Sequence, residues 1–185
     1  MIDDIKRETN QRMGKSLEAL GHAFGRIRTG RANPAILEGI QVSYYGVDTP
    51  LNQVASINVE DARTLLITPW DKKLLSDIEK AILKSDLGIT PASNAESIRI
   101  PLPPLSEENR RDLARQAKQE AEQARVAIRN IRRDAIGDVR DFLKEKEISE
   151  DDARRAEEDI QRLTDKRISE IDHALSEKEA DLLKI

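Results

Sequence analysis

The 185-residue sequence contains no cysteine and few aromatic residues, which make up 3% of the chain. The absence of cysteine excludes disulfide bonds, zinc sites built on thiolates and thiol redox chemistry. Long apolar segments are also missing, because the longest uncharged segment, Thr49–Val59, is much shorter than the ~20 residues of a membrane-spanning helix. The N-terminal residues MIDDIKRETNQR do not contain the apolar core of a secretory signal. We therefore expect a soluble, cytoplasmic protein with no membrane partner.

Excess positive charge is absent as well. The chain has 35 acidic and 31 basic residues, which gives a formal net charge of -4 at pH 7. A protein that attracts nucleic acid through its overall charge is basic rather than acidic. The composition therefore gives no support for general binding to DNA, and any nucleic-acid site has to be a local basic patch.

Proline is absent from the chain beyond residue 104, and that part contains almost no glycine. All seven prolines lie at or before Pro104, and Gly137 is the only glycine beyond Gly88. From Ser106 to the C-terminus, 18 basic and 22 acidic residues account for half of the 80 positions. Such a composition is typical of long helices that carry a narrow apolar stripe. The chain from Ser106 onward is therefore predicted to be helical.

Three long helices are predicted from apolar residues that recur at steps of three or four. The first follows the apolar residues from Ile2 to Ile27. The second begins at the N-cap Ser106 and runs to about Lys146, and the third follows almost at once from the N-cap Ser149. The short connection predicts an antiparallel hairpin, and the first helix covers the apolar surface that this hairpin leaves open. The second helix spans roughly 60 Å, so we expect an elongated three-helix bundle.

Strand signals are concentrated between the first and the second predicted helix. The segments GIQVSYYG, VASINV, TLLIT and SIRIPL carry them, and Asp71–Ser85 is the one helix expected there, with Asp71 as its N-cap. The predicted fold class is therefore α+β: residues 1–30 and 105–185 form the bundle, and residues 31–104 form an inserted small α/β domain. The chain passes between the two domains twice, and such a double connection predicts a hinge. The hinge residues are Gly30, Pro101, Pro103, Pro104 and Leu105.

Other local signals of chemistry are weak. The GKS tripeptide at Gly14–Ser16 lacks the preceding strand and the first glycine of a phosphate-binding loop, so we interpret it as helix surface. His22 and His173 stand alone, and the acidic residues at 150–152 and 157–159 are typical of the N-terminal part of a helix. We therefore expect no catalytic residue, no metal and no cofactor. Three glycines fall on one line of the first helix and are given no role: Gly14, Gly21 and Gly25.

The segment RVAIRNIRRDA, at 125–135, concentrates arginine without any lysine. At about 100° per residue, its arginines fall on one side of the second predicted helix, beside the apolar stripe. Arg132 lies nearest to that stripe, so we expect packing to restrain it most. A second basic cluster without acidic residues, RIRTGR, occupies 26–31. The arginines of the segment 125–135 are called the arginine stripe from here on: Arg125, Arg129, Arg132 and Arg133.

Two interpretations of the arginine stripe are open on the pattern alone. Guanidinium groups suit bidentate recognition of phosphates and stacking on bases, which favours a contact with RNA. Charged helix faces are common, and a solvated face without a ligand is the simpler interpretation. The corresponding alternative function is a structural or scaffolding coiled-coil protein, which predicts a dimer that is indifferent to RNA. An enzyme ranks third, because no set of catalytic residues converges.

Several motifs, spread over the whole chain, resemble those of bacterial ribosome recycling factors. They are IRTGRANP at 27–34, VSYYG at 42–46, SDLG at 85–88, IRIPLPPLSEE at 98–108, EAEQARVAIRNIRRDA at 120–135 and KEISEDD at 146–152. The resemblance implies an L-shaped molecule in which a three-helix bundle carries a small α/β domain on a two-strand hinge. This architecture agrees with the bundle, the insertion and the double connection expected from the residues.

The same resemblance implies a function in translation. Such a factor binds the ribosome after termination and, with the GTPase elongation factor G, separates it into subunits, while it hydrolyses nothing itself. Its bundle lies along large-subunit ribosomal RNA, and its smaller domain is the movable part. We expect a monomer that binds RNA through one basic edge, in a manner that weakens as salt rises. The implied RNA contacts are Arg132 first, then Arg129, Arg133, Arg28, Arg31 and Arg125.

Overall fold

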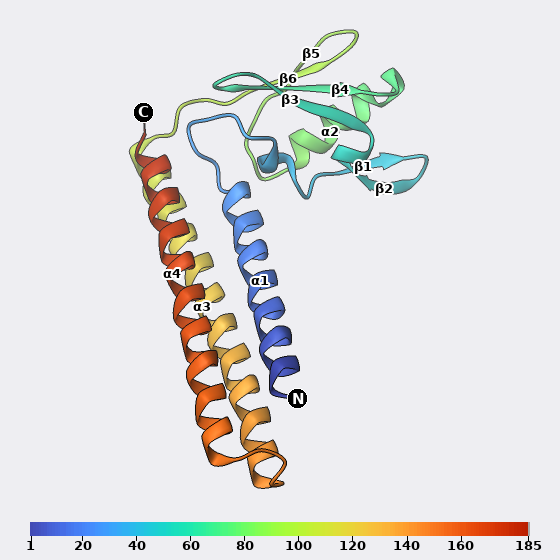
Figure 1. The fold of residues 1–185 in the computed structure, drawn as a ribbon. Helices are drawn as coiled ribbons and strands as arrows, with labels where there is room; N and C mark the ends of the chain where they lie inside the picture. The colour runs from blue at the N-terminus through green and yellow to red at the C-terminus, as the bar shows by residue number, and fades with distance from the viewer. Residues whose placement is uncertain (185) are drawn as a thin grey trace. The chain divides into compact units, whose positions relative to one another are not determined.

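A computed structural model describes residues 1–184, and Figure 1 shows the course of the chain. The chain divides into two compact units. The helical unit consists of Met1–Phe24 and Ala114–Ala180, and the mixed unit consists of Gly25–Leu113 together with the residues from Asp181 onward. Each unit has a buried apolar core of its own. The domain limits expected from the sequence, after residues 30 and 104, stay a prediction.

The helical unit is built from three helices, as the apolar periodicity predicts. They are α1 (Ile2–Arg26), α3 (Glu107–Lys144) and α4 (Glu150–Leu183); α3 begins in the mixed unit, and both α1 and α4 end there. In Figure 1, α3 and α4 run antiparallel and α1 lies beside them. Among residues 1–184, no helix combines the length and the apolar character that crossing a membrane requires.

Side-chain caps fix the starts of the two longest helices. The Oγ atom of Ser106 accepts a hydrogen bond from the backbone N–H of Asn109, with an N–O distance of 3.1 Å. The Oγ atom of Ser149 accepts an equivalent bond from the N–H of Asp152, also at 3.1 Å. Each bond satisfies one of the backbone donors that the first turn of a helix leaves unpaired. The two predicted N-caps are thus confirmed.

The C-terminus of α3 lies slightly before its predicted limit. α3 ends at Lys144, because Lys146 adopts a φ of 59° and the N–H of Glu147 donates to the carbonyl oxygen of Phe142 at 2.9 Å. A left-handed residue, followed by a backbone N–H that donates to the carbonyl oxygen five residues earlier, is the Schellman motif, which terminates helices. Glycine is the usual residue at the left-handed position, so the lysine here gave no signal in the sequence.

The core of the helical unit follows the predicted apolar stripes. Its largest fully buried side chains come from all three helices and include Met13, Ile128 and Ile160. α3 contributes small side chains as well as large ones, and small side chains at a contact reduce the distance between helix axes. The buried alanines of α3 are Ala117, Ala121, Ala124 and Ala135.

The mixed unit contains two antiparallel sheets and the helix α2 (Leu75–Lys84). The larger sheet has the strand order β3 (Ala55–Asp61), β4 (Thr64–Pro69), β6 (Ile98–Pro101) and β5 (Ala92–Ser93). The smaller sheet pairs β1 (Gln41–Tyr44) with β2 (Val47–Pro50). Apolar residues of α2 and both sheets share one core, among them Ile78, Ile82, Val42, Ile67 and Ile98. Three short 3-10 helices complete the unit, at Pro34–Leu37, Leu51–Gln53 and Lys72–Leu74.

The helix of the mixed unit begins later than its predicted start. Asp71 does cap a helical turn, since its side chain accepts a hydrogen bond from the N–H of Lys73 at 3.0 Å. That turn, Lys72–Leu74, is a 3-10 helix, and the α-helical hydrogen bonding begins only at Leu75. Short 3-10 segments at helix starts are common, because they satisfy donors near the cap.

The pattern GIQVSYYG predicts one strand with Ile40, Val42 and Tyr44 on the same face. Ile40 and Val42 are buried, but Tyr44 is 37% exposed at the end of β1. Tyr45 and Gly46 follow with φ values of 49° and 78° and lead into β2. Two successive positive φ angles match the right-handed twist of a hairpin, so the turn rather than the alternation determines where β1 ends.

The three aligned glycines of α1 have different surroundings. A Cβ atom added to Gly25 would lie 3.1 Å from the Cβ atom of Ala35, which is closer than an ordinary contact. At Gly14 it would lie 3.7 Å from the Nη2 atom of Arg167, and at Gly21 it would meet nothing within 4 Å. Only Gly25 therefore has a steric reason to lack a side chain.

Candidate nucleic-acid interface

The arginine stripe lies on the part of α3 that belongs to the helical unit. Ile128 and Ile131, which alternate with its members along the chain, are buried in the core. The stripe therefore runs along the edge of the packed face, as the helical period predicts. Arg133 is exposed, and the other three arginines are partly buried.

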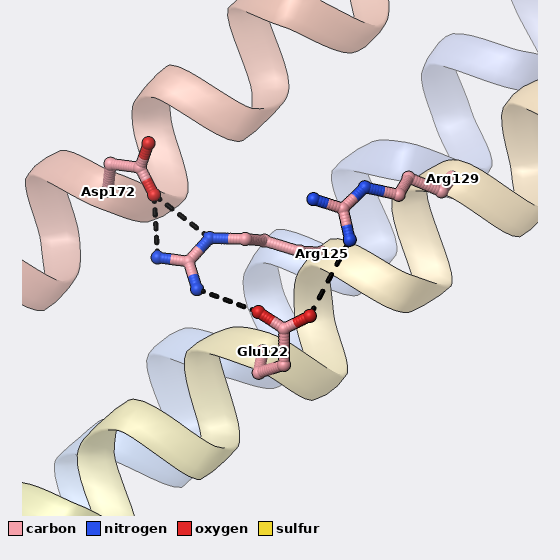
Figure 2. A network of polar contacts seen from close by, with 4 residues as sticks. All are labelled: Glu122, Arg125, Arg129 and Asp172. Atoms are coloured by element: carbon pink, nitrogen blue, oxygen red, sulfur yellow. Dashed lines mark hydrogen bonds and ion pairs between the residues drawn. The ribbon is translucent and has the colours of Figure 1, made fainter.

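Arg125 is bound within the bundle (Figure 2). Its Nε and Nη2 atoms donate hydrogen bonds to the Oδ1 atom of Asp172 on α4 at 3.0 and 2.7 Å, and its Nη1 atom donates to Oε2 of Glu122 at 3.1 Å. The hydrogen bond with Asp172 is the main reason that the pKa of Arg125 is raised above its ordinary value. With two carboxylates around it and a side chain only 20% exposed, Arg125 joins α3 to α4.

Glu122 lies between two members of the stripe (Figure 2). While Oε2 binds Arg125, its Oε1 atom lies 3.5 Å from the Nη1 atom of Arg129. The side chain of Arg129 is 43% exposed, and an exposed ion pair of this length contributes little free energy. Arg129 therefore remains accessible to a phosphate, which has only a weak ion pair to displace.

Arg132 has an uncharged partner. Its Nη1 atom donates to the Oε1 atom of Gln161 at 3.4 Å, and Gln161 in turn donates to Asp165 at 2.9 Å. An amide oxygen orients the guanidinium but carries no negative charge, so Gln161 does not compensate the charge of Arg132. Arg125 makes more hydrogen bonds to the bundle than Arg132 does, and the expectation that packing restrains Arg132 most stays a prediction. The difference arises on α4, which places Asp172 opposite Arg125 and Gln161 opposite Arg132.

Arg133 has no hydrogen bond or ion pair from its side chain to any part of residues 1–184, and it is exposed. The neighbouring carboxylate of Asp134 is already paired with Arg12 of α1, with Nη2 and Oδ2 3.1 Å apart. Asp134 is therefore a poor counter-ion for Arg133. Positive charge is thus least neutralised in the C-terminal part of the stripe, at Arg132 and Arg133.

Arg28, in the mixed unit, has a different environment. Its Nη2 atom donates to the carbonyl oxygen of Pro103, and its Nε atom is buried without a hydrogen-bond partner among residues 1–184. Desolvation by burial lowers the pKa of Arg28 from its ordinary value. The bond to Pro103 links the segment that follows α1 to the segment that precedes α3.

Both predicted hinge segments are bound to the turn between β3 and β4. The N–H of Ala32 donates to the carbonyl oxygen of Ala62 at 2.7 Å, and the N–H of Leu102 donates to that of Arg63 at 2.7 Å. Pro101 is the last residue of β6, and the exposed Pro103 and Pro104 lie between the buried Leu102 and Leu105. Arg31 is exposed, and it lines a cavity of the mixed unit together with Gly30, Pro104 and Leu105. The role of these residues as a hinge stays a prediction.

The remaining motifs have local explanations. Gly14–Ser16 lies inside α1, so the GKS tripeptide is helix surface. His173 is exposed and lies 3.1 Å from Glu177, one turn along α4. Within residues 1–184, no group of three or more potential side-chain ligands is placed to hold a metal ion. The acidic residues at 157 and 159 form ion pairs with Arg140 and Lys6.

Sequence reasoning did not identify the residues that distinguish one stripe arginine from another. Glu122, Gln161 and Asp172 decide which guanidinium is neutralised. Glu122 precedes Arg125 by three positions, so its pairing was open to prediction from helical spacing. Gln161 and Asp172 lie on another helix, and the register between α3 and α4 has no signal in the sequence of either.

Comparison with known proteins gives one consistent family. The family model described as "Ribosome recycling factor" matches residues 20–183. The chain is 60% identical to the ribosome-recycling factor of Hahella chejuensis and 56% identical to that of Acinetobacter baylyi, in alignments of 185 residues that cover 100% of each chain.

Solved structures agree with this result. The fold is similar to the solution structure of a ribosome recycling factor, with a TM-score of 0.77 and 38% identity over 100% of this chain and 98% of the other. It is also similar to the T. thermophilus ribosome recycling factor described with E. coli elongation factor G on the E. coli post-termination complex. That comparison has a TM-score of 0.70 and 46% identity and covers 100% of both chains. The predicted α+β fold class is confirmed.

Proposed function

Because this chain belongs to the ribosome recycling factor family, we propose that it binds the ribosome after termination and, with elongation factor G and GTP, separates it into subunits. The chain is a translation factor and not an enzyme, so in this proposal GTP hydrolysis belongs to elongation factor G. The T. thermophilus relative, 46% identical over the full length, is described with elongation factor G on a post-termination complex, which supports both partners. The proposed place of action is the cytoplasm.

The proposed contact with large-subunit ribosomal RNA is the C-terminal part of the arginine stripe. The observation that carries this proposal is the pairing of Arg132 with Gln161, whose neutral amide leaves the guanidinium charged and oriented. Arg133 adds an exposed cation without a partner in the described chain, and Arg129 adds one held only by a weak ion pair. A planar guanidinium held in this way suits a bidentate contact with a phosphate.

Arg125 takes a different part in the proposal. Two carboxylates neutralise it, and a phosphate would have to displace both of them. We therefore assign it to the positioning of α3 against α4, which holds the rest of the stripe in place. Arg28 is given a similar positioning role through its bond to Pro103, and Arg31 stays a candidate contact.

The acidic net charge of -4 is compatible with this interface. Phosphate contacts release counter-ions, so the affinity of a local basic patch for RNA falls as salt rises, whatever the total charge of the protein. The remaining negative surface disfavours binding to unrelated RNA. A monomer is proposed, because the apolar stripes of α1, α3 and α4 are buried within one chain.

Salt-dependent binding to vacant ribosomes tests the interface. Arg132→Ala is expected to weaken binding by about tenfold or more and to reduce the slope of log affinity against log salt by about 1. The matched control is Arg140→Ala, because Arg140 lies on the same helix, is 71% exposed and pairs with Glu157 outside the stripe. Circular dichroism melting of each variant checks that it is folded.

The outcome separates recycling from scaffolding. Equal binding of Arg132→Ala, Arg140→Ala and the unmodified protein would remove Arg132 from the interface. A protein that ignores ribosomes and sediments as a dimer would instead favour the scaffolding coiled-coil alternative. Subunit splitting, followed by light scattering with elongation factor G and GTP, tests the reaction itself.

A further inference from the structure

A small cavity of about 200 Å³ lies within the mixed unit, where the turn between β3 and β4 meets the start of α3 and the end of α4. It is distinct from the arginine stripe, which belongs to the helical unit. Its lining consists of Gly30, Arg31, Ala62, Arg63, Pro104, Leu105, Arg110, Asp181 and Lys184.

The lining is strongly basic. It contains four cationic side chains and one carboxylate, and that carboxylate, Asp181, is paired with Lys184 at 3.2 Å. The side chains of Arg31, Arg63 and Arg110 have no ion pair with any of residues 1–184. Three guanidinium groups that have no counter-ion within residues 1–184 therefore border one small space.

Arg110 supplies a second, independent observation. Its Nε atom is buried and has no hydrogen-bond partner in the part of the chain that the structure describes. Buried donors are almost always paired in folded proteins, and an unpaired one is destabilising unless a ligand or water accepts its proton. Positive charges gathered at one place also repel one another unless an anion binds between them. Both features would be satisfied by the same acceptor, a bound anion.

Hydrogen bonds fix the backbone of residues that line the cavity. The N–H of Arg63 donates to the side chain of Asp61 at 2.9 Å, and its carbonyl oxygen accepts the bond from Leu102 at 2.7 Å. Arg110 lies in the first turns of α3, where its N–H donates to the carbonyl oxygen of Ser106 at 3.0 Å. Binding would thus order side chains and leave the backbone in place, which favours affinity.

We propose that this cavity is a phosphate site that takes one phosphate group or two adjacent ones. Guanidinium groups match the geometry of phosphate oxygens, and a net lining charge of three positive units suits a multiply charged anion better than a single carboxylate. The volume is below the range of roughly 300–1,000 Å³ for sites that enclose a drug-sized molecule, so the cavity takes the phosphates and not the remainder of a nucleotide. The phosphates come either from a free diphosphate or from an RNA backbone.

Nuclear magnetic resonance titration of the full chain at low salt tests the proposal. Pyrophosphate is the first probe, and an RNA oligonucleotide with hydroxyl ends is the second. We expect saturable shifts of the backbone amides at residues 30–31, 62–63 and 110, with affinity reduced by about tenfold in Arg110→Ala. The matched control is Arg111→Ala, because Arg111 pairs with Glu107 at 2.7 Å and does not line the cavity.

The outcomes separate the two sources of phosphate. Saturation by pyrophosphate alone assigns the site to a free diphosphate, and saturation by the oligonucleotide assigns it to an RNA backbone. The absence of saturable shifts with both probes overturns the proposal, and so does equal affinity in the unmodified protein and in Arg63→Ala. Arg63→Ala changes an exposed turn residue, so it remains informative if Arg110→Ala fails to fold. No ribosome is present, so a negative result leaves the proposed recycling function intact.

Discussion

The Nη2 atom of Arg125 lies 2.7 Å from the Oδ1 atom of Asp172, and this ion pair joins α3 to α4 (Figure 2). Two helical turns further along α3, Arg132 meets the amide of Gln161 instead of a carboxylate. Arginines that look equivalent in the sequence are therefore in different electrostatic states. The charge of Arg125 is compensated by two carboxylates inside the bundle, and the charge of Arg132 is not compensated by its amide partner.

Arg125→Ala is expected to reduce stability more than it reduces binding to ribosomes. Three hydrogen bonds to two carboxylates are lost, and we expect a decrease of about 1–2 kcal/mol in the free energy of unfolding. Urea denaturation of Arg125→Ala, Asp172→Ala and the double variant measures the coupling, which we expect to be about 0.5–1.5 kcal/mol.

The exposed pair of Arg154 and Asp151 is the control for this cycle, because their side chains are 69% and 74% exposed. Arg154→Ala is expected to change stability by less than about 0.5 kcal/mol. If Arg125→Ala instead melts like the unmodified protein and binds ribosomes far more weakly, Arg125 is a contact with RNA and its assignment as a positioning residue is wrong.

Lys6→Gln is expected to make a stability difference that depends on pH. The Nζ atom of Lys6 lies 2.5 Å from Oδ2 of Asp159, and this hydrogen bond is the main reason that the pKa of Asp159 is lowered. A carboxyl with a lowered pKa stabilises the fold above its unfolded value of about 3.9, and the contribution is lost as pH falls through the folded value. The variant should therefore be less stable at pH 7 by about 0.2–1 kcal/mol and converge with the unmodified protein in acid.

Thermal melts of both proteins between pH 7 and pH 3 measure this difference. A stability difference that persists unchanged at the acid end would show that the lost interaction is the packing of the Lys6 side chain and not its charge.

Lys146→Gly is expected to stabilise the protein. Lys146 has a φ of 59°, a conformation in which a side chain is strained and glycine is not. The gain should be up to about 1 kcal/mol, because the Schellman motif at the end of α3 is preserved. Lys144→Gly is the control. Lys144 is the last residue of α3, two positions before Lys146, and glycine at a helical position should be destabilising. Denaturation of the two variants gives the comparison, and a loss of stability in both would contradict the assigned backbone conformation.

Periodicity was sufficient to predict the parts of the fold that depend on one segment at a time. The three long helices and the N-caps Ser106 and Ser149 are properties of local spacing, and the structure confirms them. The hairpin of β1 and β2 was missed because Tyr45 occupies a left-handed position that glycine, asparagine or aspartate normally takes.

The position of the candidate site could be predicted from the sequence, but not which of its arginines are paired with carboxylates. The helical period places the arginine stripe beside the core, since it depends only on α3. The partners Asp172 and Gln161 come from α4, and a shift of one helical turn between α3 and α4 would exchange which arginine meets a carboxylate. Such a register depends on how the alanines of α3 pack, and no local signal encodes it.

Replacing both Pro103 and Pro104 with glycine is expected to weaken subunit splitting while leaving ribosome binding within about twofold. Proline fixes φ near -65°, so the segment before α3 has few conformations, and two glycines would greatly increase their number. The hydrogen bond from Arg28 to the backbone carbonyl oxygen of residue 103 could still form, but it would hold a more mobile segment. Light-scattering kinetics with elongation factor G measure splitting, and the alanine double variant should lie between the glycine variant and the unmodified protein. Equal splitting rates for all three proteins would show that the stiffness of this connection does not contribute to the reaction.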